Sequence, residues 1–347
     1  MTSSPISGLV DWDAYVPREE TQAIATAARE HFSSLFSLDD LRGMLDGRPK
    51  PDLWDRLVEH GYTAVGIPES LEGLGTLVDL TALLQEAGRA LLPAPLLTHA
   101  MAAQTLEAAG MLDESTVASS LAFAFRRGDA LLVFDGAAAD FAVTVESRDD
   151  GCAMTLFPLG DAPREAVAGP DPSRAFVRIA LADLGAETQG RTLGAPADAL
   201  LAGARTCVAA DLTGVAARAL DAGIAHSLTR EQFGRPIGSF QAVKHQLADA
   251  YVEVELTRSL VLGAAVALTG EPHSDEGLRL SLMAKASAGE AAARCTALLT
   301  QLLGAIGLTY ESDSPLGVRR ARQTIPLLGH PGELYARVAL LSTGGEA

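Results

Sequence analysis

The sequence predicts an α+β fold in three parts: an N-terminal helical domain, a small antiparallel β domain and a C-terminal four-helix bundle. Apolar side chains recur at helical spacing over residues 17–113 and again from residue 197 onward, but they alternate with smaller ones over residues 118–196. The 347 residues are 48% hydrophobic and only 5% aromatic, and this aliphatic, alanine-rich composition favours helices. We therefore expect domains at 1–117, 118–196 and 197–347.

The N-terminal part is expected to consist of helices separated by breaks at proline and glycine. Segment 67–75 reads Ile-Pro-Glu-Ser-Leu-Glu-Gly-Leu-Gly, in which a proline and closely spaced glycines interrupt the helical pattern. Pro93 and Pro95 end another helix, because proline lacks the N–H that a helix interior needs. The predicted helices cover residues 18–36, 53–60, 78–90 and 98–109.

The middle part carries short alternating runs bounded by turn residues. The run Leu131–Phe134 ends at Asp135-Gly136, a dipeptide typical of turns. Short strands separated by clusters of glycine, proline and aspartate indicate an antiparallel β domain that ends near residue 196. The residues expected to alternate are Phe141, Val143 and Val145; Cys152, Met154 and Leu156; and, more loosely, Phe176, Ile179 and Leu181.

The C-terminal part is expected to contain four long or medium helices with short connections, which is the pattern of a helix bundle. The first begins near residue 197. Serine side chains cap helix starts, so we expect the second to begin at Ser239 and the third at Ser274. The third stops at Gly304, a shorter helix opens at Ser314-Pro315, and a last one covers residues 332–341.

The bulk composition excludes several classes of function. A net charge of −17 disfavours binding to nucleic acid or to an anionic membrane. The cysteines, Cys152, Cys207 and Cys295, are too far apart in sequence to indicate a disulfide framework or a metal site. The N-terminus lacks the charged lead and apolar stretch of a signal peptide, and apolar runs are interrupted, so we expect a cytoplasmic protein without a membrane span.

The most informative stretch is residues 230–241, which connect the first two helices of the bundle. It reads Arg-Glu-Gln-Phe-Gly-Arg-Pro-Ile-Gly-Ser-Phe-Gln. An arginine at such a junction suits a phosphate group, because its planar fork gives paired, charge-assisted hydrogen bonds. Glycines let the backbone approach a ligand closely. From the residues alone, an arginine-decorated turn between two helices explains the stretch equally well.

These residues resemble the Arg-x-Gln-Phe-Gly-x-Pro-Ile-x-x-Phe-Gln pattern of the acyl-CoA dehydrogenase family. The order of helices, small β domain and helical bundle is similar to that family too. Segment 67–75 resembles its Pro-Glu-x-x-Gly-Gly-x-Gly turn, with Glu72 in place of one glycine. Segment 301–311 resembles its Gln-x-x-Gly-Gly-x-Gly-x-x-x-Glu pattern, and Arg319-Arg-Ala-Arg322 follows at the expected place.

The resemblance implies FAD as the cofactor, bound across an interface between two subunits. It implies that Arg230 contacts the pyrophosphate, with Gln232, Phe233 and Gln241 beside it. It also implies that Gln301, Gly304 and Ala305 lie along the adenine end of a dinucleotide held by the neighbouring subunit. Each residue also has an ordinary explanation: Gln301 as a polar bundle residue, Gly304 as a helix cap and Phe233 as part of a core.

The sequence departs from the family at the catalytic base, which is a glutamate in one of two places. Counting from Gln301 places Leu328 at the commoner position, and counting back from Arg230 places Ala204 at the other; neither can take a proton. We interpret the nearest carboxylates, Glu311 and Glu333, as structural or solvated. The flavin-cradling Thr-Glu-Pro-x-x-Gly-Ser-Asp loop is also absent, replaced by residues 122–129.

The departures point to a subunit without catalytic residues in a heteromeric acyl-CoA dehydrogenase. The chain looks like the short subunits of α2β2 bacterial enzymes that act on steroid side-chain CoA esters, where a homologous partner supplies the glutamate and holds the flavin ring. Two alternatives stay open. The chain could be a self-sufficient homo-oligomeric flavoenzyme with a relocated base, or an interaction protein of the same fold that has lost FAD.

Overall fold

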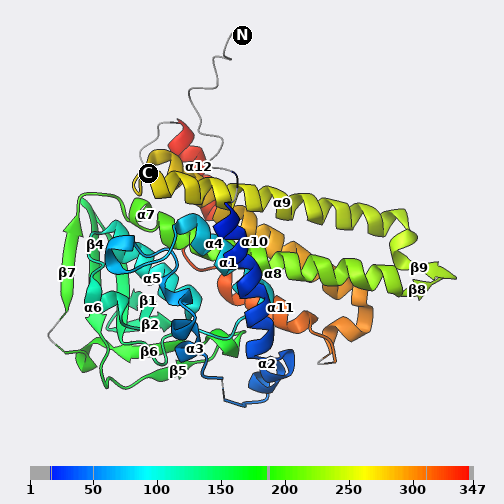
Figure 1. Ribbon diagram of the computed structural model, residues 1–347, viewed down its shortest axis with the longest axis horizontal. Helices are drawn as coiled ribbons and strands as arrows, with labels where there is room; N and C mark the ends of the chain where they lie inside the picture. Colours follow the sequence, from blue (N-terminus) through cyan, green and yellow to red (C-terminus); the bar gives the residue numbers. More distant parts are fainter. Residues whose placement is uncertain (1–15, 17, 50, 186–187, 310, 344–347) are drawn as a thin grey trace, which may run out of the picture.

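The computed structural model describes residues 16, 18–49, 51–185, 188–309 and 311–343. The N-terminal segment, in which the sequence predicts no signal peptide, lies mostly outside these residues. Figure 1 shows the sheet on one side and long helices running away from it, with the short N-terminal helices packed across the junction. This mixture of helices and a separate sheet confirms the predicted α+β class.

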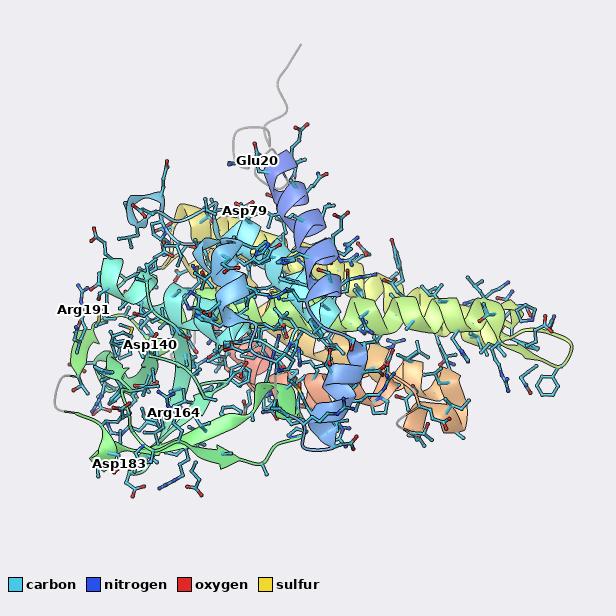
Figure 2. The ribbon with its side chains drawn as sticks, turned by 60° about the horizontal axis from the view of Figure 1, so that its bottom comes forward. Glu20, Asp79, Asp140, Arg164, Asp183 and Arg191 are labelled. Atoms are coloured by element: carbon cyan, nitrogen blue, oxygen red, sulfur yellow. The ribbon has the colours of Figure 1, made fainter. Side chains whose placement is uncertain are left out.

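Helices form the N-terminal part, and capping side chains open some of them. Ser37 and Thr76 each open a helix with a capping box, in which side chain and backbone groups satisfy each other's hydrogen bonds. Thr21 donates to Asp79 at 2.5 Å and joins the starts of α1 and α4, near the labelled Glu20 (Figure 2). The elements are α1 Glu19–Leu35, α2 Leu38–Leu45, α3 Trp54–Glu59, η2 Tyr62–Ala64, η3 Glu69–Leu71, α4 Leu77–Ala90, α5 Leu96–Ala108 and α6 Glu114–Val117.

The sheet has seven strands in the order β5-β6-β2-β1-β3-β4-β7. All neighbours are antiparallel except β1 and β3, which are parallel; β1 pairs with β3 through residues 121–123 and with β2 through residues 124–127. Leu181, expected to alternate with the strand residues, lies just beyond β6 in η5. The elements are β1 Leu121–Arg127, β2 Ala130–Phe134, β3 Phe141–Arg148, β4 Gly151–Pro158, β5 Glu165–Val167, η4 Pro172–Arg174, β6 Phe176–Ala180, η5 Leu181–Asp183 and β7 Gln189–Leu193.

Arginine side chains tie the connections of the sheet to carbonyl groups. Arg164 donates to the carbonyls of Ala137 and Ala139 at 2.6 and 2.8 Å. Arg191 on β7 donates to the carbonyl of Ala109 at 2.5 Å and so joins the sheet edge to the end of α5; Figure 2 labels both arginines. Such bonds satisfy backbone groups that turns leave without a ladder partner.

Three long antiparallel helices, α8, α9 and α10, form the bundle with the shorter α11 (Figure 1). Ser274 caps α10 as predicted, accepting a hydrogen bond from the N–H of Gly277. The start predicted at Ser239 is wrong, because Ile237–Ser239 form a separate 3-10 turn and Phe240 precedes α9 without a side-chain cap bond. Helix α11 opens at Ser314-Pro315 as predicted, although the Ser314 hydroxyl bonds to Thr300 and does not cap the helix. The elements are α7 Ala197–Leu200, α8 Ala202–Thr229, β8 Glu231–Gln232, β9 Arg235–Pro236, η6 Ile237–Ser239, α9 Gln241–Gly270, α10 Asp275–Leu303, η7 Gly304–Leu308, α11 Ser314–Thr324 and α12 Pro331–Thr343.

One hydrophobic core extends from the N-terminal helices through the bundle to the inner face of the sheet. Phe123 and Phe134 belong to it, and Phe125 and Phe176 pack against it, with neighbouring rings 5.2–6.3 Å apart. By length and composition alone, one segment of the described chain, Asp275–Leu308, passes as able to cross a membrane. The division into domains 1–117, 118–196 and 197–347 stays a prediction.

Candidate functional site

The stretch after α8 forms a small hairpin that projects from the tip of the bundle (Figure 1). Strands β8 and β9 pair Gln232 with Arg235, and the turn between them holds Phe233 and Gly234 at φ 55° and 76°. Positive φ at both central residues is typical of a tight hairpin turn, but it is unfavourable for a bulky residue such as phenylalanine. The hairpin therefore holds Phe233 on a strained backbone, with the residue 92% exposed.

Arg230 stands at the base of this hairpin as the residue that ends α8. Its N–H donates to the carbonyl of His226, and its own carbonyl accepts from the N–H of Ile237, both at 2.8 Å. Its side chain is exposed, and none of the described residues bonds to its guanidinium group. Arg235 is different, because its guanidinium lies 4.1 Å from the centre of the Phe240 ring. Arg230 thus carries an exposed guanidinium that is available for an anion.

The second predicted group lies where α10 ends. Gln301 is exposed in the last turn, and Gly304 caps the helix at φ 65°, a backbone conformation that favours glycine. A side chain added at Gly304 would meet nothing within 4 Å, so the backbone there is open to a ligand. Ala305 is also exposed, in η7.

Helix connectivity brings the two groups to the same end of the bundle. Because α8, α9 and α10 alternate in direction, the end of α8, the start of α9 with the exposed Gln241, and the end of α10 face one way (Figure 1). Near this end, Gly223 of α8 lies against Leu302 of α10 and Leu247 of α9. The structure therefore exposes all seven predicted residues on one tip of the molecule.

The two positions of the family's base also meet, but inside the core. Ala204 is fully buried in α8, and Leu328 is half-buried against the same core. The neighbouring Arg205 donates through Nε to the carbonyl of Leu328 at 3.5 Å. Glu333 accepts from the backbone N–H of His330 at the start of α12, and Glu311 is exposed. The described residues at the two base positions carry no carboxylate.

Two buried cations hold the loop that carries Leu328: Arg205, which follows Ala204 where the family also has arginine, and Lys285, which was not singled out from the sequence. Lys285 donates to the carbonyl of Ile325 at 2.7 Å, and Arg205 pairs with Asp198 at 2.8 Å. Burial, together with the charge of Arg205, lowers the pKa of Lys285 to about 7. A lone lysine between alanines in an apolar helix is the sequence signal that could have indicated it.

The connection between β5 and β6 is joined to the bundle by buried ion pairs. Arg174 pairs with Asp211 of α8 at 2.8 Å, with both side chains at most 1% exposed. Arg320 of α11 pairs with Asp171 at 2.5 Å and donates to the hydroxyl of Ser173. Burial opposes the charge on Asp171, but Arg320 holds the pKa of this carboxyl below its ordinary value. Together with the four phenylalanines, these pairs fill the junction between sheet and bundle.

Residues 122–129, which replace the flavin loop, form regular structure. They belong to β1 and to a tight turn at Gly128, after which β2 pairs back along β1. Residues 124–127 pair with β2 and the N–H of Phe123 donates to the hydroxyl of Thr98 at 2.8 Å, in contrast to the open backbone at Gly304.

Comparisons with known proteins agree with this arrangement. A family model described as "Acyl-CoA dehydrogenase, C-terminal domain" matches residues 195–329. Acyl-CoA dehydrogenase IpdE2 of Mycobacterium tuberculosis is 35% identical over 293 residues, which are 82% of this chain and 85% of that protein.

Solved structures of the same fold cover nearly the whole chain. The Tcur3481-Tcur3483 steroid acyl-CoA dehydrogenase, solved as a variant, has a TM-score of 0.78 at 28% identity and covers 94% of this chain and 98% of its own. A glutaryl-CoA dehydrogenase from Mycobacterium smegmatis in complex with FADH2 has a TM-score of 0.73 at 16% identity, with 97% of each chain covered.

Proposed function

Because the chain belongs to the acyl-CoA dehydrogenase family, we propose that it completes the FAD site of a homologous partner and itself lacks the catalytic glutamate. FAD is the cofactor of the family. The pair of chains introduces an α,β double bond into an acyl-CoA thioester. In this proposal the partner contributes the base and the pocket for the flavin ring.

Two regions of this chain differ: the predicted FAD residues are exposed, whereas the positions of the family's base carry no acidic group. This difference carries the proposal. The predicted FAD residues are exposed at one tip, and Arg230 has no partner among the described residues. At the base positions, Ala204 is buried in the core and Leu328 is half-buried against it, and neither side chain can accept a proton. An exposed guanidinium fits a pyrophosphate, since it offers charge-assisted hydrogen bonds without first breaking an ion pair.

In this role the chain binds and orients the cofactor. FAD, when bound, supplies the acceptor for the hydride that leaves the acyl chain. Arg230 would hold the pyrophosphate, with Gln232, Phe233 and Gln241 beside it. Gln301, Gly304 and Ala305 would border the adenine end. No group at Ala204 or Leu328 accepts the α-proton, so that step falls to the partner.

The proposal for the partner and the substrate rests on similarity to a solved structure. The Tcur3481-Tcur3483 enzyme is named as two chains and as a steroid acyl-CoA dehydrogenase. We therefore propose an α2β2 assembly acting on a CoA ester of a steroid side chain. Exposed apolar side chains near the tip are consistent with a protein partner there; they include Leu228, Phe233, Ile306 and Leu308.

The test is to produce the chain alone and together with its homologous partner, and to count flavin per chain. We expect FAD-loaded, active protein only from the pair, with one FAD per two chains. Arg230→Ala should weaken FAD retention by roughly ten- to a hundredfold, because a charged hydrogen bond contributes about 1.5–3 kcal/mol. Arg148→Ala, at an exposed arginine of the sheet, is the matched control.

The alternatives give different results in the same experiment. A self-sufficient flavoenzyme would be a yellow, active homo-oligomer when produced alone, and that outcome would overturn the proposal. An interaction protein that has lost FAD would stay colourless with every homologous partner, and Arg230→Ala would then change nothing.

A further inference from the structure

A small cavity lies at the end of the bundle opposite the hairpin, beside the sheet, where α8 begins and α9 ends (Figure 1). Its volume is about 150 Å³, and its walls are residues 66–68 and 75–77, the last turns of α5 and the first turn of α8. The apolar side chains that line it are Ile67, Pro68, Leu77, Ala108, Leu268 and Pro272. The cavity shares no residue with the groups predicted to bind FAD, which lie at the other tip.

Among the described residues that line this cavity, only Glu107 of α5 is charged. It is half-buried, and none of the described residues forms an ion pair with it. Its carboxylate accepts one hydrogen bond, at 3.2 Å, from Nε2 of Gln104. Burial raises the pKa of Glu107 above its ordinary value, and the bond from Gln104 opposes this only in part. A carboxylate that has lost hydration without gaining a cation favours a positively charged ligand.

The side-chain donors around the cavity are already used. Gln104 donates both amide hydrogens, one to a backbone carbonyl at 2.8 Å and the other to Glu107. The hydroxyls of Thr76 and Thr269 donate to a carboxylate and to a backbone carbonyl. Because both neighbours of the Gln104 nitrogen are oxygens, the orientation of the amide is fixed and its own oxygen remains an acceptor. The side chains therefore offer a ligand acceptors only, on Glu107 and Gln104.

Free acceptors and one uncompensated negative charge match an ammonium group, which has three N–H donors and no acceptor. The apolar walls match a short alkyl chain. A cavity of about 150 Å³ holds a molecule the size of benzene, so a nucleotide or a CoA ester is too large for it. We propose that this cavity binds a small primary alkylammonium ion, whose N–H groups donate to Glu107 and Gln104 while its alkyl chain packs on the apolar walls. Binding here requires neither FAD nor a partner subunit.

The test is to titrate the full chain with n-butylammonium chloride at neutral pH, against sodium chloride at the same ionic strength. Saturation-transfer NMR of the ligand measures the affinity. We expect saturable binding in the millimolar range, because a ligand with so few atoms makes few contacts. n-Butanol has the same chain length without the charge. It should bind about tenfold more weakly, since it leaves the carboxylate without a counter-ion.

Variants assign the binding to this cavity. Glu107→Gln keeps the shape of the side chain and removes its charge, so it should lower the affinity for n-butylammonium about tenfold and leave that for n-butanol unchanged. Glu114→Gln, at an exposed carboxylate of α6, is the matched control and should change neither affinity. Ala108→Leu fills the cavity and leaves Glu107 in place, and it should abolish binding of both molecules. Melting temperatures check that each variant keeps the fold.

Three outcomes would overturn the inference. n-Butylammonium could show no saturable binding to the native chain. It could bind equally well to Glu107→Gln, in which case this carboxylate does not hold the ammonium group. Sodium butyrate could bind more tightly than n-butylammonium, which would make the cavity a site for anions. Failure of the proposed FAD role would leave these measurements unchanged, because Arg230 lies at the opposite end of α8 from the cavity.

Discussion

The most unusual single residue is Lys285, a lysine with no exposed surface in the middle of α10. Its ammonium group donates to the carbonyls of Ile325 and Gly329, at 2.7 and 3.4 Å. These carbonyls flank Leu328, whose φ of 57° is rare for a residue with a side chain. The lysine thus stabilises a strained turn in the loop where the family's base would stand.

Lys285 should make the stability of the fold depend on pH. Its pKa is about 7 in the folded chain and near 10.5 when unfolded, so between these values the unfolded state binds one more proton. The free energy of unfolding should therefore rise with pH from about 7 to 10.5, by up to about 1.4 kcal/mol per pH unit. Urea titrations of the native chain and of Lys285→Met, at pH 6 to 9.5, measure this contribution.

The comparison of the native chain with Lys285→Met controls for the other titrating groups. Both proteins share every other ionisable residue, so only the difference between their slopes reports on Lys285. Equal slopes above pH 7 would show that the lysine stays charged when buried, and the proposed cause would be wrong.

For single residues, the sequence predicts exposed binding residues better than it predicts buried charged residues. Arg230 and Gln301 belong to short patterns that can be read along the chain. Lys285 and Asp211 cannot be assigned that way, because their partners lie 40 and 37 positions distant in sequence. A buried charge is stable only with such partners, so its role follows from tertiary structure.

At the scale of elements, α4 and α8 approach each other more closely than side chains would allow. A Cβ added at Gly88 would lie 2.0 Å from the carbonyl oxygen of Asp211, and one at Gly214 would lie 2.0 Å from that of Gln85. Glycine is needed here for contact between the two helices, although it is a poor helix former.

Gly88→Ala should therefore destabilise the chain despite the better helix propensity of alanine. We expect a loss of about 1–3 kcal/mol in the free energy of unfolding, since the helices must separate to admit the methyl group. Gly332→Ala in α12 is the control, because nothing lies within 4 Å of the added atom. If Gly88→Ala stabilised the chain as much as the control, the close contact would not exist in solution.

Most helices and strands follow from periodicity, whereas their ends and pairings do not. The periodic segments before and after the sheet are helices close to the predicted bounds, as α4 and α5 illustrate. The start of α9 was predicted too early, at Ser239, because residues Ile237–Ser239 form the separate short helix η6. The parallel pairing of β1 with β3 depends on where the chain crosses after β2, and the alternating pattern carries no information about that crossing.

At the scale of the whole molecule, the sheet and the bundle depend on each other. The buried pair of Arg174 with Asp211 and that of Arg320 with Asp171 cross the junction between them. Separating the two parts would leave each charge without its partner, and breaking a buried pair costs about 3–5 kcal/mol. The inner phenylalanines would lose their contacts at the same time.

We therefore expect the sheet and the bundle to unfold as one cooperative unit. Native-state hydrogen exchange should give amides of β2 and α8 the same free energy of opening, because no partly unfolded form keeps only one of them. Asp211→Ala should then lower both values equally, by about 3–5 kcal/mol. Asp221→Ala, which breaks an exposed pair with Arg89, should lower both by at most about 1 kcal/mol. If Asp211→Ala lowered the value for β2 alone, the sheet would be an independent unit, and the buried pairs would attach it without coupling its unfolding to that of the bundle.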